Sequence, residues 1–245
     1  MRHSSTPLLT AIPLALAAFG LGAAAQAQTA SVSPEPTTMS RSAQADASDA
    51  QDRVNNAVKV VNEMQQDTHL AHLLERARGV FVIPHFAKGA LIVGGEGGGG
   101  VVLARHAARW SDPAFFVVSG ASIGAQAGGS GGAVAMLLMT PRALEKFESS
   151  TSKWSLSAGA GLTVVRYSGN VRARTVPRGD VIVWSDQEGL YGGLAASATD
   201  VMPEAKLDHA YYQKHVSPRQ ILTGEARNSN AAPLRDALIM RVASK

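Results

Sequence analysis

The sequence predicts an α+β fold, with a glycine-rich, mainly antiparallel β-sheet or barrel-like core covered by N-terminal amphipathic helices and a middle helix. Apolar residues fall near helical spacing between residues 53 and 76, and from residue 79 onward short β-branched segments are separated by Gly, Pro and Asp. These strands do not alternate regularly with long helices, which favours α+β over a doubly wound α/β fold. With 245 residues, 45% of them hydrophobic, we expect one folded domain with appendages.

The first 27 residues are typical of a secretory signal peptide. A short basic start precedes an apolar core from Leu8 to about Ala25, and Ala25-Gln26-Ala27 forms a small-residue cleavage site. A retained membrane anchor is the alternative, which Pro13 and the small residues of the core disfavour. The sequence contains no cysteine, so we expect neither a lipoprotein, nor disulfides, nor thiolate metal sites. We therefore expect an exported protein that is periplasmic, associated with the outer membrane, or secreted.

Residues 28–48 are rich in Ser, Thr, Pro, Ala and Gln, and we expect them to form a disordered tether. The single folded domain is then predicted over residues 49–245. Its first element is one or two amphipathic helices over residues 52–78, with a break near Thr68 or Gly79. Their apolar faces are expected to cover the sheet, with membrane insertion as the alternative.

Further elements follow from local signals. Short segments between residues 79 and 138, and others near 154–168, 180–186 and 189–198, are predicted strands. A helix is predicted after Thr140, a suitable N-cap, with Pro141 at its first position. Residues 203–215 and 217–222 are predicted to add short helical pieces.

The stretch GGEGGGG, residues 94–100, can be matched to the dinucleotide pattern G-x-G-x-x-G. That pattern requires a helix after the glycines, whereas Val101-Val102-Leu103 predicts another strand. We therefore interpret the stretch as a glycine-rich turn between two core strands. Glu96 is then either a turn residue facing water or a functional carboxylate that lacks a second member for acid–base catalysis.

The stretch GASIG, residues 120–124, matches the nucleophile pattern G-x-S-x-G around Ser122. Histidines and aspartates follow in suitable chain order, namely Asp180, Asp186, Asp200, His209 and His215. A nucleophile elbow needs a helix directly after the serine, and AQAGGSGGAV is a poor helix former. A serine hydrolase is therefore a hypothesis that depends on a histidine within reach of Ser122.

Other chemistries have weak support. His69 and His72 could share a helix face, but no carboxylate stands at ligand spacing, so we expect no metal and no cofactor. The net charge is +4 and aromatic residues make up 5%, without a basic–aromatic ladder, so we expect no nucleic-acid partner.

The order of several motifs resembles the SYLF domain family over about residues 50–225. The motifs are Arg78-Gly79, Ile83-Pro84, Lys88-Gly89, Gly97 to Gly100, Trp110-Ser111 with Pro113, Gly120 with Gly124, Gln126 and Gly128, Gly189-Leu190-Tyr191-Gly192-Gly193, and Tyr211-Tyr212. Arg78 stands where the family usually has lysine, and Gly192 replaces a common alanine. The stretch from residue 155 to 175 lacks the family's aspartate-containing turn and glycine–proline element.

The resemblance implies a non-catalytic domain that binds lipid or a membrane surface, since eukaryotic members bind phosphoinositides and some bind actin. For this chain we expect an anionic phospholipid or membrane surface as the partner, with an envelope protein-interaction or structural module as the alternative. Headgroups need several converging cations. The candidate lipid-binding residues are Arg53, Lys59, Arg76, Arg78, Lys88, Arg172, Arg174 and Arg178.

Overall fold

A curled β-sheet forms the centre of the computed structural model, which describes residues 40–90, 93–107, 109–123, 128–156, 161–167, 178–187 and 199–239. Within these residues the sheet has nine strands in the order β6-β9-β4-β2-β1-β5-β8-β7, with β3 paired to β2. The strands are β1 (Gly79–Ala90), β2 (Val93–His106), β3 (Arg109–Trp110), β4 (Ala114–Ile123), β5 (Gly128–Leu138), β6 (Trp154–Ser155), β7 (Val164–Arg166), β8 (Val181–Ser185) and β9 (Thr199–Pro203). Only the β7–β8 pair is parallel among them.

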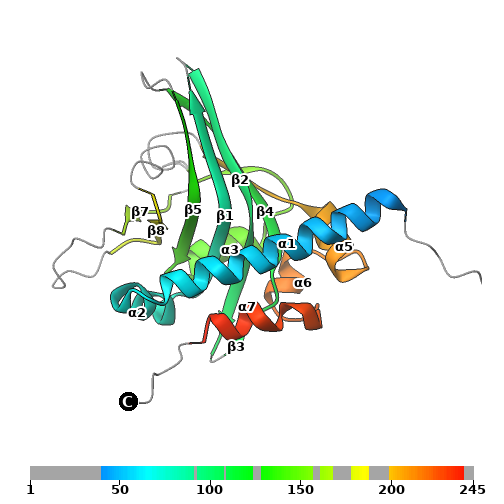
Figure 1. Cartoon of the computed structure of the whole chain (residues 1–245). Coiled ribbons are helices and arrows are strands. Elements are labelled where there is room, and N and C mark those ends of the chain that lie inside the picture. Colours follow the sequence, from blue (N-terminus) through cyan, green and yellow to red (C-terminus); the bar gives the residue numbers. More distant parts are fainter. Residues whose placement is uncertain are drawn as a thin grey trace, which may run out of the picture. The chain divides into compact units, whose positions relative to one another are not determined.

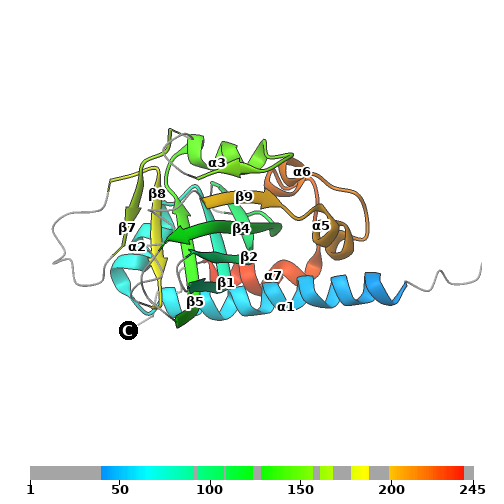
Figure 2. The ribbon, with the colours of Figure 1, turned by 90° about the horizontal axis from the view of Figure 1, so that it is seen from above.

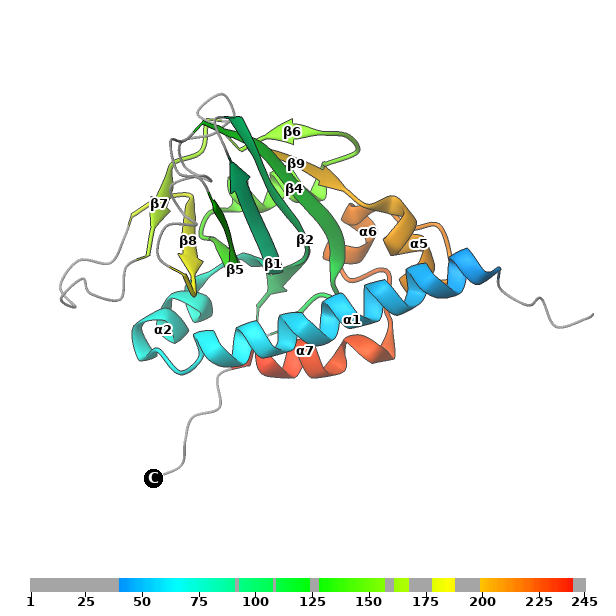
Figure 3. The ribbon, with the colours of Figure 1, turned by 45° about the horizontal axis from the view of Figure 1, so that its top comes forward.

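Helices cover both faces of this sheet. They are α1 (Arg41–Met64), α2 (Thr68–Arg76), α3 (Pro141–Glu148), α5 (Ala205–Tyr212), α6 (Pro218–Leu222) and α7 (Ala232–Ala237), with a short 3-10 helix at Ser229–Ala231. The long helix α1 crosses one face of the sheet, and α3 lies on the other (Figures 1 and 2). Helix α7, which the sequence did not predict, runs beside α1 (Figure 3). The predicted α+β class with a mainly antiparallel sheet is confirmed.

The N-terminal boundary of the domain differs from the prediction. Helix α1 begins at Arg41, inside the range assigned to the tether, and the Ser40 hydroxyl accepts a hydrogen bond from the Ala43 amide at 3.3 Å. Alanines favour helix over coil here, and Lys206 of α5 forms a 2.9 Å ion pair with Asp46. The predicted tether therefore ends too late. Its first part and the predicted signal peptide, residues 1–27, lie outside the described residues.

The glycine stretch is a strand, so its interpretation as a turn is wrong. Residues 94–97 pair with β1, and residues 94–100 pair with β4, so the stretch lies in the middle of the sheet. The β1 register advances five residues from Val82 to Ala87 while β2 advances four from Val101 to Gly97, which is a β-bulge around Pro84. A Cβ on Gly98 would lie 2.4 Å from the His85 carbonyl oxygen of this bulge. Glycine is needed because the bulged backbone packs against β2.

The core packs on both faces of the sheet and includes an aromatic cluster between α3 and the sheet. Phe147 of α3 packs edge to face against Phe81, Phe116 and Trp154, with ring centroids 5.2–5.5 Å apart. On the α1 side Val54, Val61 and other apolar residues of the helix are buried. A fully buried side chain of this size contributes about 1.5–3 kcal/mol, so both helices are held firmly on the sheet.

Candidate functional site

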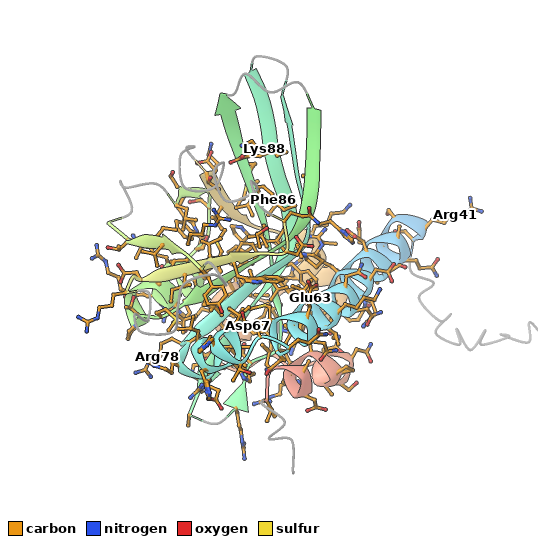
Figure 4. All side chains as sticks on the ribbon, turned by 60° about the vertical axis from the view of Figure 1, so that its left-hand side comes forward. Arg41, Glu63, Asp67, Arg78, Phe86 and Lys88 are labelled. Atoms are coloured by element: carbon orange, nitrogen blue, oxygen red, sulfur yellow. The ribbon has the colours of Figure 1, made fainter. Side chains whose placement is uncertain are left out.

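The sequence-predicted cations do not gather at one place. Arg78 directly precedes strand β1, and Lys88 lies ten residues further along the chain near the other end of that strand, roughly 30 Å away. Figure 4 shows these two side chains at opposite ends of the strand, with Arg41 far from both at the start of α1. Lys59 is exposed on α1, where it donates to the Asn56 side chain at 2.9 Å. Arg172 and Arg174 lie outside the described residues, and Arg178 is exposed.

Arg53 has a role inside the fold. Its guanidinium pairs with Glu204 and, at 3.1 Å, with Asp49, and its side chain is only 16% exposed. It also lies directly against Gly99, where an added Cβ would be 2.2 Å from the guanidinium. Arg53 thus links α1 to the glycine strand and to the start of α5, and it is poorly placed to contact a headgroup.

Lys88 stands directly opposite Glu96 in the β1–β2 register, so opposite charges face each other on neighbouring strands. Glu96 is buried, at 5% exposure, which contradicts the interpretation of Glu96 as a turn residue facing water. Lys88 therefore stands at the far end of β1 from Arg78, opposite a buried carboxylate.

A surface pocket of about 380 Å³ brings together residues that the sequence did not connect. It is located where β1 begins and β2 ends, between α3 and α6. Its lining residues are Arg78, Arg105, His106, Pro141, Leu144, Glu145, Glu148 and Arg219. Of these only Arg78 was a candidate from the sequence. Arg105 and Arg219 were missed because 114 residues separate them, and no local pattern shows that β2 and α6 meet.

Local structure fixes the walls of this pocket. Gly79 lets α3 approach β1 closely, because a Cβ there would lie 3.0 Å from both the Leu103 carbonyl oxygen and the Leu144 Cδ1. Ser217 and Gln220 form a capping box that starts α6 and so positions Arg219. His106 donates from Nε2 to the Leu222 carbonyl oxygen at 2.6 Å, which joins β2 to the end of α6.

Five arginines lie at this end of the sheet, and we refer to them as the basic end: Arg76, Arg78, Arg105, Arg109 and Arg219. Arg76 closes α2 two residues before Arg78, and Arg109 stands opposite His106 in the β2–β3 pairing. Helix α2 and strand β3 mark this end in Figure 1. Within the described part of the chain, none of the five guanidiniums lies within 4.0 Å of a carboxylate oxygen. Their charges are therefore available to a ligand.

Ser122 is not on a nucleophile elbow. It lies within β4, paired with Gly94 of β2, and the next described element is strand β5. A nucleophile elbow places the serine on a sharp turn from a strand into a helix. The backbone at Ser122 therefore lacks the elbow that the G-x-S-x-G pattern would require.

The motif residues of the C-terminal part build an internal polar network. The Asp208 carboxylate is fully buried and accepts a hydrogen bond from the Phe115 amide at 3.0 Å. The Tyr212 hydroxyl donates to the Pro113 carbonyl oxygen at 2.8 Å, and Asp112 pairs with Arg235. Burial, together with the nearby Glu204, raises the pKa of Asp208 to about 7. This network connects β4, α5 and α7, so these motifs stabilise the fold.

The described residues contain no group of three or more His, Asp or Glu side chains arranged to hold a metal ion. The same residues include no helix with the length and apolar character needed to span a membrane.

Comparisons with known proteins identify a family for part of the chain. The model of the Ysc84 family, described as "Las17-binding protein actin regulator", matches residues 119–240. The cattle SH3 domain-containing YSC84-like protein 1 is 24% identical over 207 residues, which cover 78% of this chain and 59% of that protein. Protein YSC84 of Saccharomyces cerevisiae is 23% identical over 164 residues, covering 66% of this chain and 35% of that protein. This chain thus spans between about a third and three fifths of these relatives, and no solved structure matches it.

Proposed function

We propose that this chain is a non-catalytic domain that binds anionic phospholipid at a membrane surface. The match of residues 119–240 to the Ysc84 (SYLF) family model supports this proposal. The observation that supports this proposal is the basic end. Its five arginines come from α2, the residue before β1, β2, β3 and α6, and three of them, Arg78, Arg105 and Arg219, line one pocket. None of the five has a carboxylate partner among the described residues.

The size of this charge cluster suits reversible adhesion. A cation near an anionic membrane contributes about 1 kcal/mol, so five would contribute roughly 5 kcal/mol if all reach the surface together. A free energy of that size corresponds to a dissociation constant on the order of 0.1–1 mM. Binding of this strength depends on the lipid composition and on salt, and it releases the protein readily.

The place of action is part of the same proposal. The basic start, apolar core and Ala25-Gln26-Ala27 site of the first 27 residues support export, so the membrane surface would belong to the cell envelope. We place the protein in the periplasm, at the outer membrane, or outside the cell. The description of the family and the name of LAS seventeen-binding protein 3 of Saccharomyces cerevisiae, a relative of this chain, refer to protein partners. A protein-interaction module of the envelope is therefore the second candidate function.

The proposal is tested by co-sedimentation of the full chain with lipid vesicles. Vesicles of neutral phosphatidylcholine are compared with vesicles that also contain phosphatidylglycerol, at about 0.1 M and about 1 M salt. The Debye length falls from about 10 Å to about 3 Å between these conditions. We expect sedimentation only with the anionic vesicles and its loss at high salt. The absence of binding to either vesicle would contradict the lipid proposal and favour the interaction module.

A further inference from the structure

The pocket at the basic end is lined by both positively and negatively charged side chains. The arginines and the glutamates come from different parts of the fold. Arg105 comes from β2, Arg78 directly precedes β1 and Arg219 comes from α6, whereas Glu145 and Glu148 both come from α3. Although all five line one pocket, the described residues contain no ion pair within 4.0 Å between these arginines and these glutamates. The opposite charges therefore face the pocket without neutralising each other directly.

The position of the two glutamates is unfavourable for the helix itself. They lie in the second half of α3, and Glu148 is its last residue. The C-terminal end of a helix carries partial negative charge, so a carboxylate there costs about 0.3–1 kcal/mol. A cation bound in the pocket would offset this cost.

The other lining residues restrict the chemical class of ligand that the pocket can bind. The pocket has no Phe, Tyr or Trp in its wall, and aromatic faces are the usual means of binding a quaternary ammonium. Carboxylates instead accept hydrogen bonds from a primary ammonium, and guanidiniums bind phosphate oxygens in bidentate fashion. A volume of about 380 Å³ lies in the range of small-molecule pockets and exceeds what a lone phosphate ion needs.

We infer that this pocket binds a zwitterionic phosphoethanolamine group, with the phosphate on the arginine wall and the primary ammonium on the α3 wall. This inference rests on the proposed function, because it names the headgroup that the same surface selects. The basic end attracts the protein to the membrane, and the pocket then recognises one headgroup. Free phosphoethanolamine has the same phosphate and primary ammonium groups as the phosphatidylethanolamine headgroup, so it could bind the pocket in the same way.

The first test uses vesicles with a constant phosphatidylglycerol content, in which the remaining lipid is either phosphatidylethanolamine or phosphatidylcholine. We expect the full chain to bind the phosphatidylethanolamine vesicles about fivefold more tightly, equivalent to about 1 kcal/mol. The Glu145→Gln/Glu148→Gln variant should lose this preference, yet bind anionic vesicles as well as or better than the wild type because repulsion is removed. The matched control Glu63→Gln/Glu75→Gln changes two exposed carboxylates of α1 and α2 and should keep the preference.

The second test separates the lipid from the free group. Phosphoethanolamine, phosphocholine and inorganic phosphate are each titrated against the full chain while NMR amide shifts are recorded. We expect shifts at residues around Arg78 and Arg219 with phosphoethanolamine and weaker binding of the other two probes. Equal binding of phosphoethanolamine and inorganic phosphate, or equal binding of the two vesicle types, would overturn the inference. Binding of soluble phosphoethanolamine without any vesicle binding would support the pocket and contradict the proposed membrane function.

Discussion

Single glycines in β2 differ sharply in what they do, although they are adjacent in the sequence. A Cβ on Gly98 would lie 2.4 Å from the His85 carbonyl oxygen, and one on Gly100 would lie 2.3 Å from that of Val82. A Cβ on Gly95 would meet no atom within 4 Å. Composition alone treats these positions as equivalent, but the bulge of β1 distinguishes them.

We therefore predict that Gly98→Ala lowers the free energy of unfolding by about 1–3 kcal/mol or more, because backbone atoms must move to admit the methyl group. Gly95→Ala is the matched control and should change it by less than about 0.5 kcal/mol. Urea unfolding followed by circular dichroism measures both variants. If both variants lose similar amounts of unfolding free energy, packing against the bulge is not the reason that glycine is needed at residue 98.

Asp208 should make the stability of the protein depend on pH. The pKa of this buried carboxyl is raised from about 3.8 in the unfolded chain to about 7 in the folded protein. Between these values the folded state holds a proton that the unfolded state has released, so this group lowers stability as the pH rises from about 4 to about 7. The slope approaches about 1.4 kcal/mol per pH unit.

The Asp208→Asn variant should remove this dependence and keep an oxygen that accepts from the Phe115 amide. Denaturant unfolding of the wild type and the variant at several pH values measures the difference in their free energies of unfolding. We expect that difference to shift in favour of the variant by more than about 1 kcal/mol as the pH rises from about 5 to about 7. Asp236→Asn, on an exposed position of α7, is the control. A difference that does not vary with pH would contradict the assignment.

At the scale of elements, local signals predicted the start of α3 correctly and the glycine stretch wrongly. Thr140 and Pro141 predicted the start of α3 correctly, because capping and proline geometry act within one helical turn. The glycine stretch was predicted to be a turn because glycine favours turns, but its pairing depends on the bulge at Pro84, ten or more residues away in the sequence. Helix α1 starts earlier than predicted because its first turns are supported partly by α5, including the ion pair between Asp46 and Lys206.

The Thr140 side chain holds the start of helix α3 in place. The Thr140 hydroxyl accepts from the Ala143 amide and donates to Asp180 at 2.8 Å, so one side chain caps α3 and joins it to the start of β8. Thr140→Val should lower the free energy of unfolding by about 1–2 kcal/mol, whereas Thr140→Ser should retain most of the stability. Thermal and urea unfolding measure both variants, and equal stability of the Val and Ser variants would contradict this role.

At the scale of the whole molecule, the sheet joins charges that are far apart in the sequence. The sequence identified Arg76 and Arg78 of the basic end, because both lie in the predicted helix-to-strand junction. It could not add Arg105, Arg109 and Arg219, since only the β1–β2 pairing and the contact of α6 with β2 bring them to the same place. It also included Arg53, whose pairing with Glu204 spans 151 residues.

The most direct test of the account compares two double variants that remove the same charge from different places. Arg78→Gln/Arg219→Gln removes two cations of the basic end, and Arg41→Gln/Lys59→Gln removes two exposed cations of α1. Vesicle-binding constants are measured for the full chain with phosphatidylglycerol-containing vesicles at about 0.1 M salt, after thermal unfolding has shown that each variant is folded. We predict a loss of about 30-fold for the first variant, from about 2 kcal/mol, and less than about threefold for the second. Equal losses in the two variants would contradict the account, because binding would then follow net charge and not the basic end.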